Sequence, residues 1–326
     1  MIQKLVLTGM GQKDFNMDSY NGLHILVTGA TGYIGSALIN ALRKHNCTVH
    51  ISKGDVSLKE TWDNLISDNI DIIFHLAAVE VGHEVPERDL NVNATAVLHM
   101  LQTCVEKKCN PKIIFSSSTN LFGDVNKGGV VDEQTQSSPP AEWAAHKLLA
   151  ENYLRIYSKK YGLKTITLRL PNIYGPVLDM KSLDRKSSGT LISRVIKYGL
   201  EHKKLKLFKN KDCLRDYIFV DDIVDAFLKS GLITDKFYDG RFFVIASKAP
   251  AITISDVWNE IAKNINATIS VDTSYKLNPI EMRSYTGNYS QFNKITGWVP
   301  KTNLQNGIAI AVKNMKKLIN ETNETK

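Results

Sequence analysis

The sequence predicts an α/β fold in which helices cover both faces of a doubly wound parallel sheet. Strand-like apolar runs alternate with helical patterns from residue 24 to residue 176, and a glycine-rich turn follows the first run. This βαβα alternation is typical of parallel sheets. After Pro176 the pattern loosens into polar loops with short strands and helices, which predicts a smaller C-terminal α/β lobe around a cleft.

The individual elements follow from the local pattern. The first strand is an unbroken apolar run, and the helix after it repeats apolar residues at Ala37, Leu38, Ala41 and Leu42. Strands are expected at 24–30, 48–52, 70–78, 111–119, 164–176 and 241–247, and helices at 35–45, 58–69, 93–108, 141–162, 254–265 and near 304–319. We therefore expect an N-terminal extension (1–22), a main domain (23–176) and a lobe (177–326) with some segments returning to the main sheet.

Composition narrows the function classes. The chain has 326 residues, 43% of them hydrophobic, and lacks an apolar run of about 18 residues, so no membrane contact is expected. The four cysteines lack metal-binding spacing, which predicts no metal site and a reduced, cytoplasmic protein. The net charge of +8 comes from scattered lysines without a basic stripe, so a small phosphorylated ligand explains it better than nucleic acid.

The turn "TGATGYIG" (28–35) is the most informative motif. Gly29, Gly32 and Gly35 follow a strand and open a helix, an arrangement that lets the backbone approach a pyrophosphate at the helix N-terminus. This predicts a Rossmann-type NAD(P)-binding domain. Ser52 and Lys53 stand where an acidic residue would hold the ribose of NAD. The pair suits a 2′-phosphate and favours NADP slightly over NAD, and Asp55 is expected near the adenine.

Seven motifs in order resemble the extended short-chain dehydrogenases/reductases, the NAD-dependent epimerase/dehydratase group that acts on nucleotide sugars. They are "TGATGYIG" (28–35), "HLAA" (75–78), "NVNAT" (91–95), "FSSSTNLFG" (115–123), "RLPNIYGP" (169–176), "RDYIFVDDIVDA" (215–226) and "TGWVPK" (296–301). The resemblance implies a nucleoside-diphosphate sugar as substrate, with Ser118 and Lys147 as catalytic residues.

The resemblance also assigns binding residues position by position. It implies substrate contacts at Thr119, Asn172, Arg215 and Arg283, where the arginine fork suits phosphate oxygens. Together with the turn and the second strand, it predicts cofactor contacts at Gly29, Thr31, Gly32, Tyr33, Ile34, Gly35, Ser52, Lys53, Asp55, Val56, Leu76, Ala77, Ala78, Asn91, Ser116, Lys147, Pro171 and Ile173.

One position departs from the family pattern. The family places a tyrosine four residues before its lysine, and this chain has Trp143 there. Tyrosine exchanges a proton as the hydride moves, whereas indole only donates. The proton could be handled by Ser118 through water, by His83 or Glu84, or by His146. Tyr153 lies about 15 Å along the helix, too far away to serve.

Two further questions stay open at this stage. The chain is expected to be an active epimerase, dehydratase or reductase, or else a regulatory or partner subunit that binds both ligands without redox activity, and an unrelated ligand on the same scaffold is a third possibility. Trp143 could also serve as a steric or stacking element for the substrate.

The apolar faces of the helices at 93–108 and 141–160 favour a homodimer.

Overall fold

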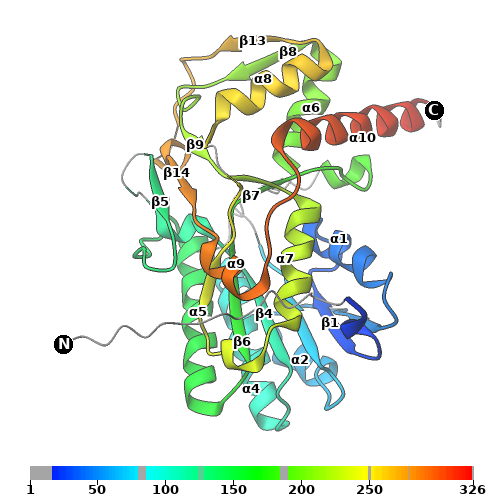
Figure 1. The fold of residues 1–326 in the computed structure, drawn as a ribbon, viewed down its shortest axis with the longest axis vertical. Helices are drawn as coiled ribbons and strands as arrows, with labels where there is room; N and C mark the ends of the chain where they lie inside the picture. Colours follow the sequence, from blue (N-terminus) through cyan, green and yellow to red (C-terminus); the bar gives the residue numbers. More distant parts are fainter. Residues whose placement is uncertain are drawn as a thin grey trace.

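The main sheet is parallel and has six strands in the order β11-β6-β4-β3-β1-β2 (Figure 1). The computed structural model describes residues 17–79, 86–123, 125, 128–183, 190–248, 251–277 and 279–324. The strands are β1 (His24–Thr28), β2 (Thr48–Ile51), β3 (Ile72–His75), β4 (Lys112–Ser118), β6 (Thr165–Leu170) and β11 (Phe242–Val244). From β1 the chain passes to β2 on one side and then to β3 on the other, so the strand order switches between β1 and β3.

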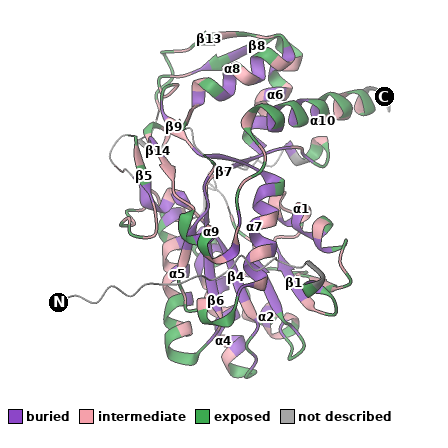
Figure 2. Cartoon of the chain, in the orientation of Figure 1, coloured by how far each residue is buried: buried purple, intermediate pink, exposed green. Residues whose placement is uncertain are grey.

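Helices cover both faces of this sheet, as predicted. Contacts join α1 to α7 on one face and α2, α4 and α5 on the other. These helices are α1 (Tyr33–Leu42), α2 (Lys59–Leu65), α4 (Ala96–Glu106), α5 (Glu142–Tyr161) and α7 (Val220–Leu232). Figure 2 shows the strands buried beneath them.

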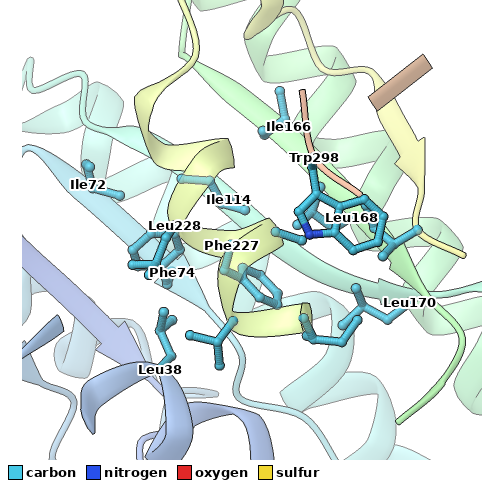
Figure 3. Close-up of a cluster of buried hydrophobic side chains, with 14 of the residues drawn as sticks. Leu38, Ile72, Phe74, Ile114, Ile166, Leu168, Leu170, Phe227, Leu228 and Trp298 are labelled. Atoms are coloured by element: carbon cyan, nitrogen blue, oxygen red, sulfur yellow. The ribbon is translucent and has the colours of Figure 1, made fainter. Parts of the chain in front are cut away.

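Side chains alternate between the two faces along each strand, and each face has its own apolar core. Ile25 and Val27 pack toward α1 and α7, whereas Leu26 between them packs toward α2 and α4. Figure 3 shows the first core, where Phe227 and Leu228 of α7 meet strand side chains and Trp298. Burying both faces explains why these strands read as continuous apolar runs.

A smaller lobe lies at the end of the molecule where α6, α8 and α10 gather (Figure 1). It contains α6 (Leu191–His202), β8 (Lys204–Leu207), α8 (Ile254–Ile265), β13 (Thr268–Val271) and α10 (Leu304–Glu324), which share one apolar cluster. The last helix runs to Glu324, five residues beyond its predicted end near 319. After residue 176, α7, β11, α9 (Ser290–Thr296) and Trp298 belong to the main sheet and its core.

Short elements connect the two parts. Paired short strands are β7 (Asn172–Tyr174) with β10 (Tyr217–Phe219), β5 (Gly129–Val131) with β14 (Tyr285–Gly287), and β9 (Leu214–Arg215) with β12 (Ile252–Thr253). The helix expected at 93–108 begins earlier, as α3 (Pro86–Leu90) followed by a π-helical turn at Asn91–Thr95. Short 3-10 helices occupy Met17–Tyr20, Thr119–Phe122, Met180–Leu183, Asp235–Phe237 and Pro279–Met282.

Among the helices described, none combines the length and apolar character needed to cross a membrane.

Candidate active site

The glycine turn between β1 and α1 leaves no room for side chains. Gly29 has φ of +68°, and a methyl group added there would lie 2.7 Å from the amide nitrogen of Ala77. A methyl group on Gly35 would lie 2.1 Å from the carbonyl oxygen of Gly29. No side chain caps the start of α1 at Gly32. The turn therefore presents backbone N–H groups and a helix N-terminus to an anion, which fits the phosphates of a dinucleotide.

Thr28 fixes the loop that faces this turn across the strand switch. Its hydroxyl oxygen accepts hydrogen bonds from the backbone N–H groups of Leu76 and Ala77, both at 3.2 Å. The same oxygen shares a hydrogen bond with Nδ1 of His75 at 2.7 Å. Burial, with a smaller contribution from the charge of Lys147, lowers the pKa of His75 to about 3. His75 is therefore neutral near pH 7.

Further predicted cofactor residues lie in this turn and at the start of α1, after β3, and in the π-helical turn. Tyr33 and Ile34 pack against the main core, Thr31 and Ala78 are exposed, and Leu76 and Ala77 are half-buried. Asn91 is exposed and accepts a hydrogen bond from Thr95. The buried neighbour Asn93 instead holds both the N–H and the carbonyl of Val79, each at 3.0 Å.

The end of β2 carries the residues that bear on cofactor choice. Lys53 is exposed, and the Ser52 hydroxyl is buried without a hydrogen-bond partner in the described chain. Asp55 accepts hydrogen bonds from the backbone and hydroxyl of Ser57, which lower its pKa. Val56 is buried, and its carbonyl accepts the indole proton of Trp62. No acidic side chain directly follows β2.

Helix α5 brings the predicted catalytic residues to the carboxyl end of β4. The ammonium of Lys147 is buried, donates to the carbonyl of Ser116 at 2.8 Å, and lies 4.5 Å from the centre of the Phe115 ring. The Ser118 hydroxyl accepts the N–H of Asn120 at 3.1 Å. Trp143 is half-buried, and its indole nitrogen has no acceptor among the described residues.

Four other residues could carry the proton in place of a tyrosine, and they differ in their surroundings. His146 is half-buried next to Lys147, and its Nδ1 has no partner in the described part of the chain. His83 and Glu84 lie outside the described residues. Ser118 keeps its own proton for a further partner, because its oxygen is the acceptor in its bond with Asn120.

A pocket beside β4 brings together the four predicted substrate residues. Its empty space is about 260 Å³, part of it open to solvent. Its walls come from the ends of β4 and β6, from β9 and from residues 283–285. They comprise Thr119, Asn120, Pro171, Asn172, Leu214, Arg215, Asp216, Arg283 and Tyr285. The predicted cofactor residue Pro171 is among them, whereas Ile173 is buried in the main core.

Two arginines give this pocket its charge. Arg215 donates to the backbone carbonyls of Glu281, at 2.8 Å, and of Arg283. Burial, and to a smaller extent the neighbouring Arg215, lowers the pKa of Arg283, which stays protonated near neutral pH. Two guanidinium groups at one pocket favour a ligand with negative charge.

Several residues that shape the pocket were not predicted. The buried Asp216 carboxylate accepts hydrogen bonds from Ser247 and from the N–H of Gly287, and burial raises its pKa. The Tyr285 hydroxyl donates to the carbonyl of Thr119 at 2.8 Å. Asp216 directly follows the predicted Arg215, and Tyr285 is two residues after the predicted Arg283. This proximity in the sequence is the signal that could have placed both residues at the pocket.

A glycine turn of this kind at the switch point of a parallel sheet is typical of α/β dinucleotide-binding proteins. Comparison with known protein families identifies the family within this class. The chain belongs to the NAD dependent epimerase/dehydratase family, whose model matches residues 25–246.

Individual relatives are distant. The chain is 25% identical over 327 residues to the Arabidopsis thaliana trifunctional UDP-glucose 4,6-dehydratase/UDP-4-keto-6-deoxy-D-glucose 3,5-epimerase/UDP-4-keto-L-rhamnose-reductase. That match covers 90% of this chain but 47% of the relative, so the chain spans about half its length. A UDP-glucose 4-epimerase of Mycolicibacterium smegmatis is 24% identical, with 89% and 97% covered.

Solved structures share the fold. A UDP-glucose 4-epimerase from Thermotoga maritima, solved with UDP-glucose, superimposes with a TM-score of 0.79 at 23% identity, covering 91% of this chain and 100% of the other. The protein RMD from Pseudomonas aeruginosa, solved with NADPH, gives 0.78 at 18% identity, covering 91% and 98%.

Proposed function

We propose that this chain is an NAD(P)-dependent enzyme that acts by hydride transfer on a nucleoside-diphosphate sugar, with non-standard proton transfer. One observation carries the proposal: the glycine turn, the buried Lys147 and the pocket of Arg215 and Arg283 meet at the carboxyl edge of one sheet. A dinucleotide at the strand switch and a second phosphorylated ligand beside β4 can therefore lie along the same edge of the sheet.

Each part of the site has a distinct role in this proposal. The turn at Gly29 and the N-terminus of α1 would bind the cofactor phosphates, and Lys147 would hold the nicotinamide ribose. When bound, the nicotinamide supplies a hydride donor or acceptor. Arg283, positioned by Arg215 through the carbonyls of residues 281 and 283, would bind the sugar-nucleotide phosphates. Thr119 and Asn172 line the same pocket and would contact the sugar nucleotide.

The second strand supports NADP over NAD in the same proposal. Lys53 is exposed at the end of β2, beside a buried Ser52 hydroxyl that has no partner in the described chain. A cation and a hydroxyl donor suit a 2′-phosphate, whereas an acid at this place suits the free ribose hydroxyls. Among the similar structures, RMD was solved with NADPH and a UDP-glucuronic acid 4-epimerase of Bacillus cereus with NAD.

The test uses purified protein with each cofactor form and a panel of UDP-, GDP-, CDP- and dTDP-sugars. Nicotinamide absorbance and product mass are followed, and binding of both ligands is measured separately by calorimetry. Conversion of at least one sugar is expected. Binding of cofactor and sugar without conversion would instead support a regulatory or partner subunit without redox activity. Trp143 agrees with that alternative because indole accepts no proton. Failure to bind any nucleotide sugar would reject both functions.

We also propose a homodimer formed through α4 and α5, in the cytoplasm. Helix α5 exposes Ile156 at 46% and Tyr161 at 44%, and the Tyr161 ring lies 5.0 Å from that of Tyr157. An interface along α5 would cover these apolar side chains. All four cysteines are free thiols, which supports a cytoplasmic location. Light scattering that gives the mass of a monomer would reject the dimer.

A further inference from the structure

Helix α4 ends in a turn that brings two cysteines together. Cys104 lies in the last turn of the helix, and Cys109 follows it shortly before β4. The backbone N–H of Cys109 donates to the carbonyl of Cys104, and that of Lys108 donates to the carbonyl of Val105, both at 3.1 Å. Lys108 between them has φ of +55°. These hydrogen bonds around a left-handed residue define a Schellman motif, in which the side chains at the positions of Cys104 and Cys109 frequently contact each other.

The side chains of the pair are in contact, as this motif predicts. Sγ of Cys109 lies 3.8 Å from the carbonyl oxygen of Cys104, and the two thiols hydrogen-bond each other. Both belong to the apolar core that α2, α4 and α5 share. Cys104 is fully buried, whereas Cys109 is 8% exposed and lies between the exposed residues Lys108 and Asn110. Cys109 is therefore the member of the pair that lies nearer to solvent.

The two thiols also differ in reactivity. The hydrogen bond between them lowers the pKa of Cys109 and, together with burial, raises the pKa of Cys104. Because the thiolate is the nucleophile in thiol chemistry, Cys109 should react first with an oxidant. The other two cysteines, Cys47 and Cys213, each donate to a backbone carbonyl at 3.4 Å instead.

We propose that Cys104 and Cys109 form a reversible disulfide when a hydroperoxide oxidises the protein, so that the end of α4 is a thiol modification site. The Cys109 thiolate attacks one peroxide oxygen, the O–O bond breaks, and hydroxide leaves as Cys109 becomes a sulfenic acid. Cys104 then attacks the sulfenic sulfur, and the S–S bond forms as the S–O bond breaks and water leaves with the Cys104 proton. The sulfurs lose two electrons, the peroxide gains them, and a dithiol reverses the change.

The inference is independent of the proposed function. Cys109 precedes the first residue of β4, whereas the candidate active site lies at the carboxyl end of that strand. Transient, redox-sensing disulfides are also the kind found in reducing compartments. The pair can therefore be tested without any nucleotide sugar.

Peptide mapping tests the linkage, because trypsin cleaves after Lys107 and Lys108, between the two cysteines. The protein is treated briefly with hydrogen peroxide, its remaining thiols are alkylated, and the digest is analysed by mass spectrometry. The peptide of residues 89–107 should be joined to that of residues 109–112, and dithiothreitol should separate them. Cys47 and Cys213 should be recovered alkylated.

Variants separate the roles of the two thiols. In Cys104→Ala, Cys109 should stop at the sulfenic acid, which dimedone traps, whereas the wild type should give little adduct because Cys104 consumes it. In Cys109→Ala, Cys104 should stay reduced at the same peroxide concentration. Cys47→Ala is the matched control and should form the same disulfide, and circular dichroism checks that each variant is folded. Cys109 should react about 10-fold faster than Cys47, whose pKa is raised by burial.

Oxidation should also hold the end of the helix closed. The amide protons of Lys108 and Cys109 exchange with solvent when the last turn opens, and a covalent link across that turn opposes the opening. Their hydrogen exchange should therefore slow by about 10-fold in the oxidised protein. Peptides that stay separate after oxidation, or disulfides that include Cys47 or Cys213 as often, would overturn the inference. So would unchanged hydrogen exchange in a protein whose peptides are linked only after unfolding.

Discussion

The cofactor side of the site and its substrate side are built by different means. On the cofactor side, backbone atoms crowd together, and a single methyl group on Gly29 or Gly35 has no space. On the substrate side, two charged side chains line an open pocket, and backbone carbonyls hold one of them. The first kind of site depends on shape and the second on charge, so the two should fail differently when residues are changed.

The largest expected effect is that of Gly29→Ala on cofactor binding. A left-handed conformation costs an L-residue about 1–2 kcal/mol, and the contact with Ala77 adds about 1–3 kcal/mol. NAD(P) affinity should therefore fall by about 30-fold or more, because the turn must open. Gly22→Ala is the matched control: φ is +80° there and a methyl group meets nothing within 4 Å. Calorimetry that finds similar cofactor affinities for the two variants would contradict a turn defined by shape.

Removal of a guanidinium group tests the charge-based side. Arg283→Gln should weaken nucleotide-sugar binding by about 10- to 100-fold, since a hydrogen bond to a charged group contributes about 1.5–3 kcal/mol. Thermal stability should not fall, because the variant also removes a buried charge beside Arg215. Arg215→Gln should lower both the affinity for the nucleotide sugar and the thermal stability, because the variant loses the hydrogen bonds that Arg215 donates to the carbonyls of Glu281 and Arg283. Arg241→Gln, at an exposed pair with Asp239, is the control. Unchanged affinity in Arg283→Gln would remove Arg283 from the phosphate site.

The buried polar group on the cofactor side should make folding depend on pH. The pKa of His75 is about 3 in the folded protein and about 6.5 when unfolded, so between these values only the unfolded chain binds the proton. Stability should therefore fall as pH decreases below 6.5, by about 1.4 kcal/mol for each pH unit, and should not depend on this group above pH 7.5.

Urea unfolding of the protein and of His75→Asn at pH 7.5, 6.5 and 5.5 measures this contribution. Asparagine keeps an acceptor for the Thr28 hydroxyl but does not titrate. The variant is expected to lose less stability than the wild type between pH 6.5 and 5.5. Parallel losses would show that His75 is not the group responsible.

The difference between the two sides also explains what could be predicted from the sequence. The phosphate turn is one local segment, so the spacing of Gly29, Gly32 and Gly35 predicts it. Apolar runs between helical patterns predict the six strands of the sheet. The strand expected at 164–176 is divided, because residues 172–174 pair with β10 instead. Asp216 and Tyr285 act through partners far along the chain, Ser247 and Thr119, and no local pattern reveals such pairs. Asn93 lies in the same motif as Asn91, but the resemblance assigned the contact to Asn91, whereas the structure buries Asn93 and leaves Asn91 exposed.

The smallest expected effect concerns Lys53, an exposed charge on the cofactor side. Lys53→Ala should weaken NADPH binding by about fivefold and leave NADH binding nearly unchanged, because an exposed cation contributes about 1 kcal/mol to a phosphate contact. The difference should shrink at high salt, since an exposed pair is screened, unlike the steric effect at Gly29. Lys44→Ala, an exposed lysine after α1, controls for net charge. Equal losses for both cofactors, or none, would show that Lys53 does not select the 2′-phosphate.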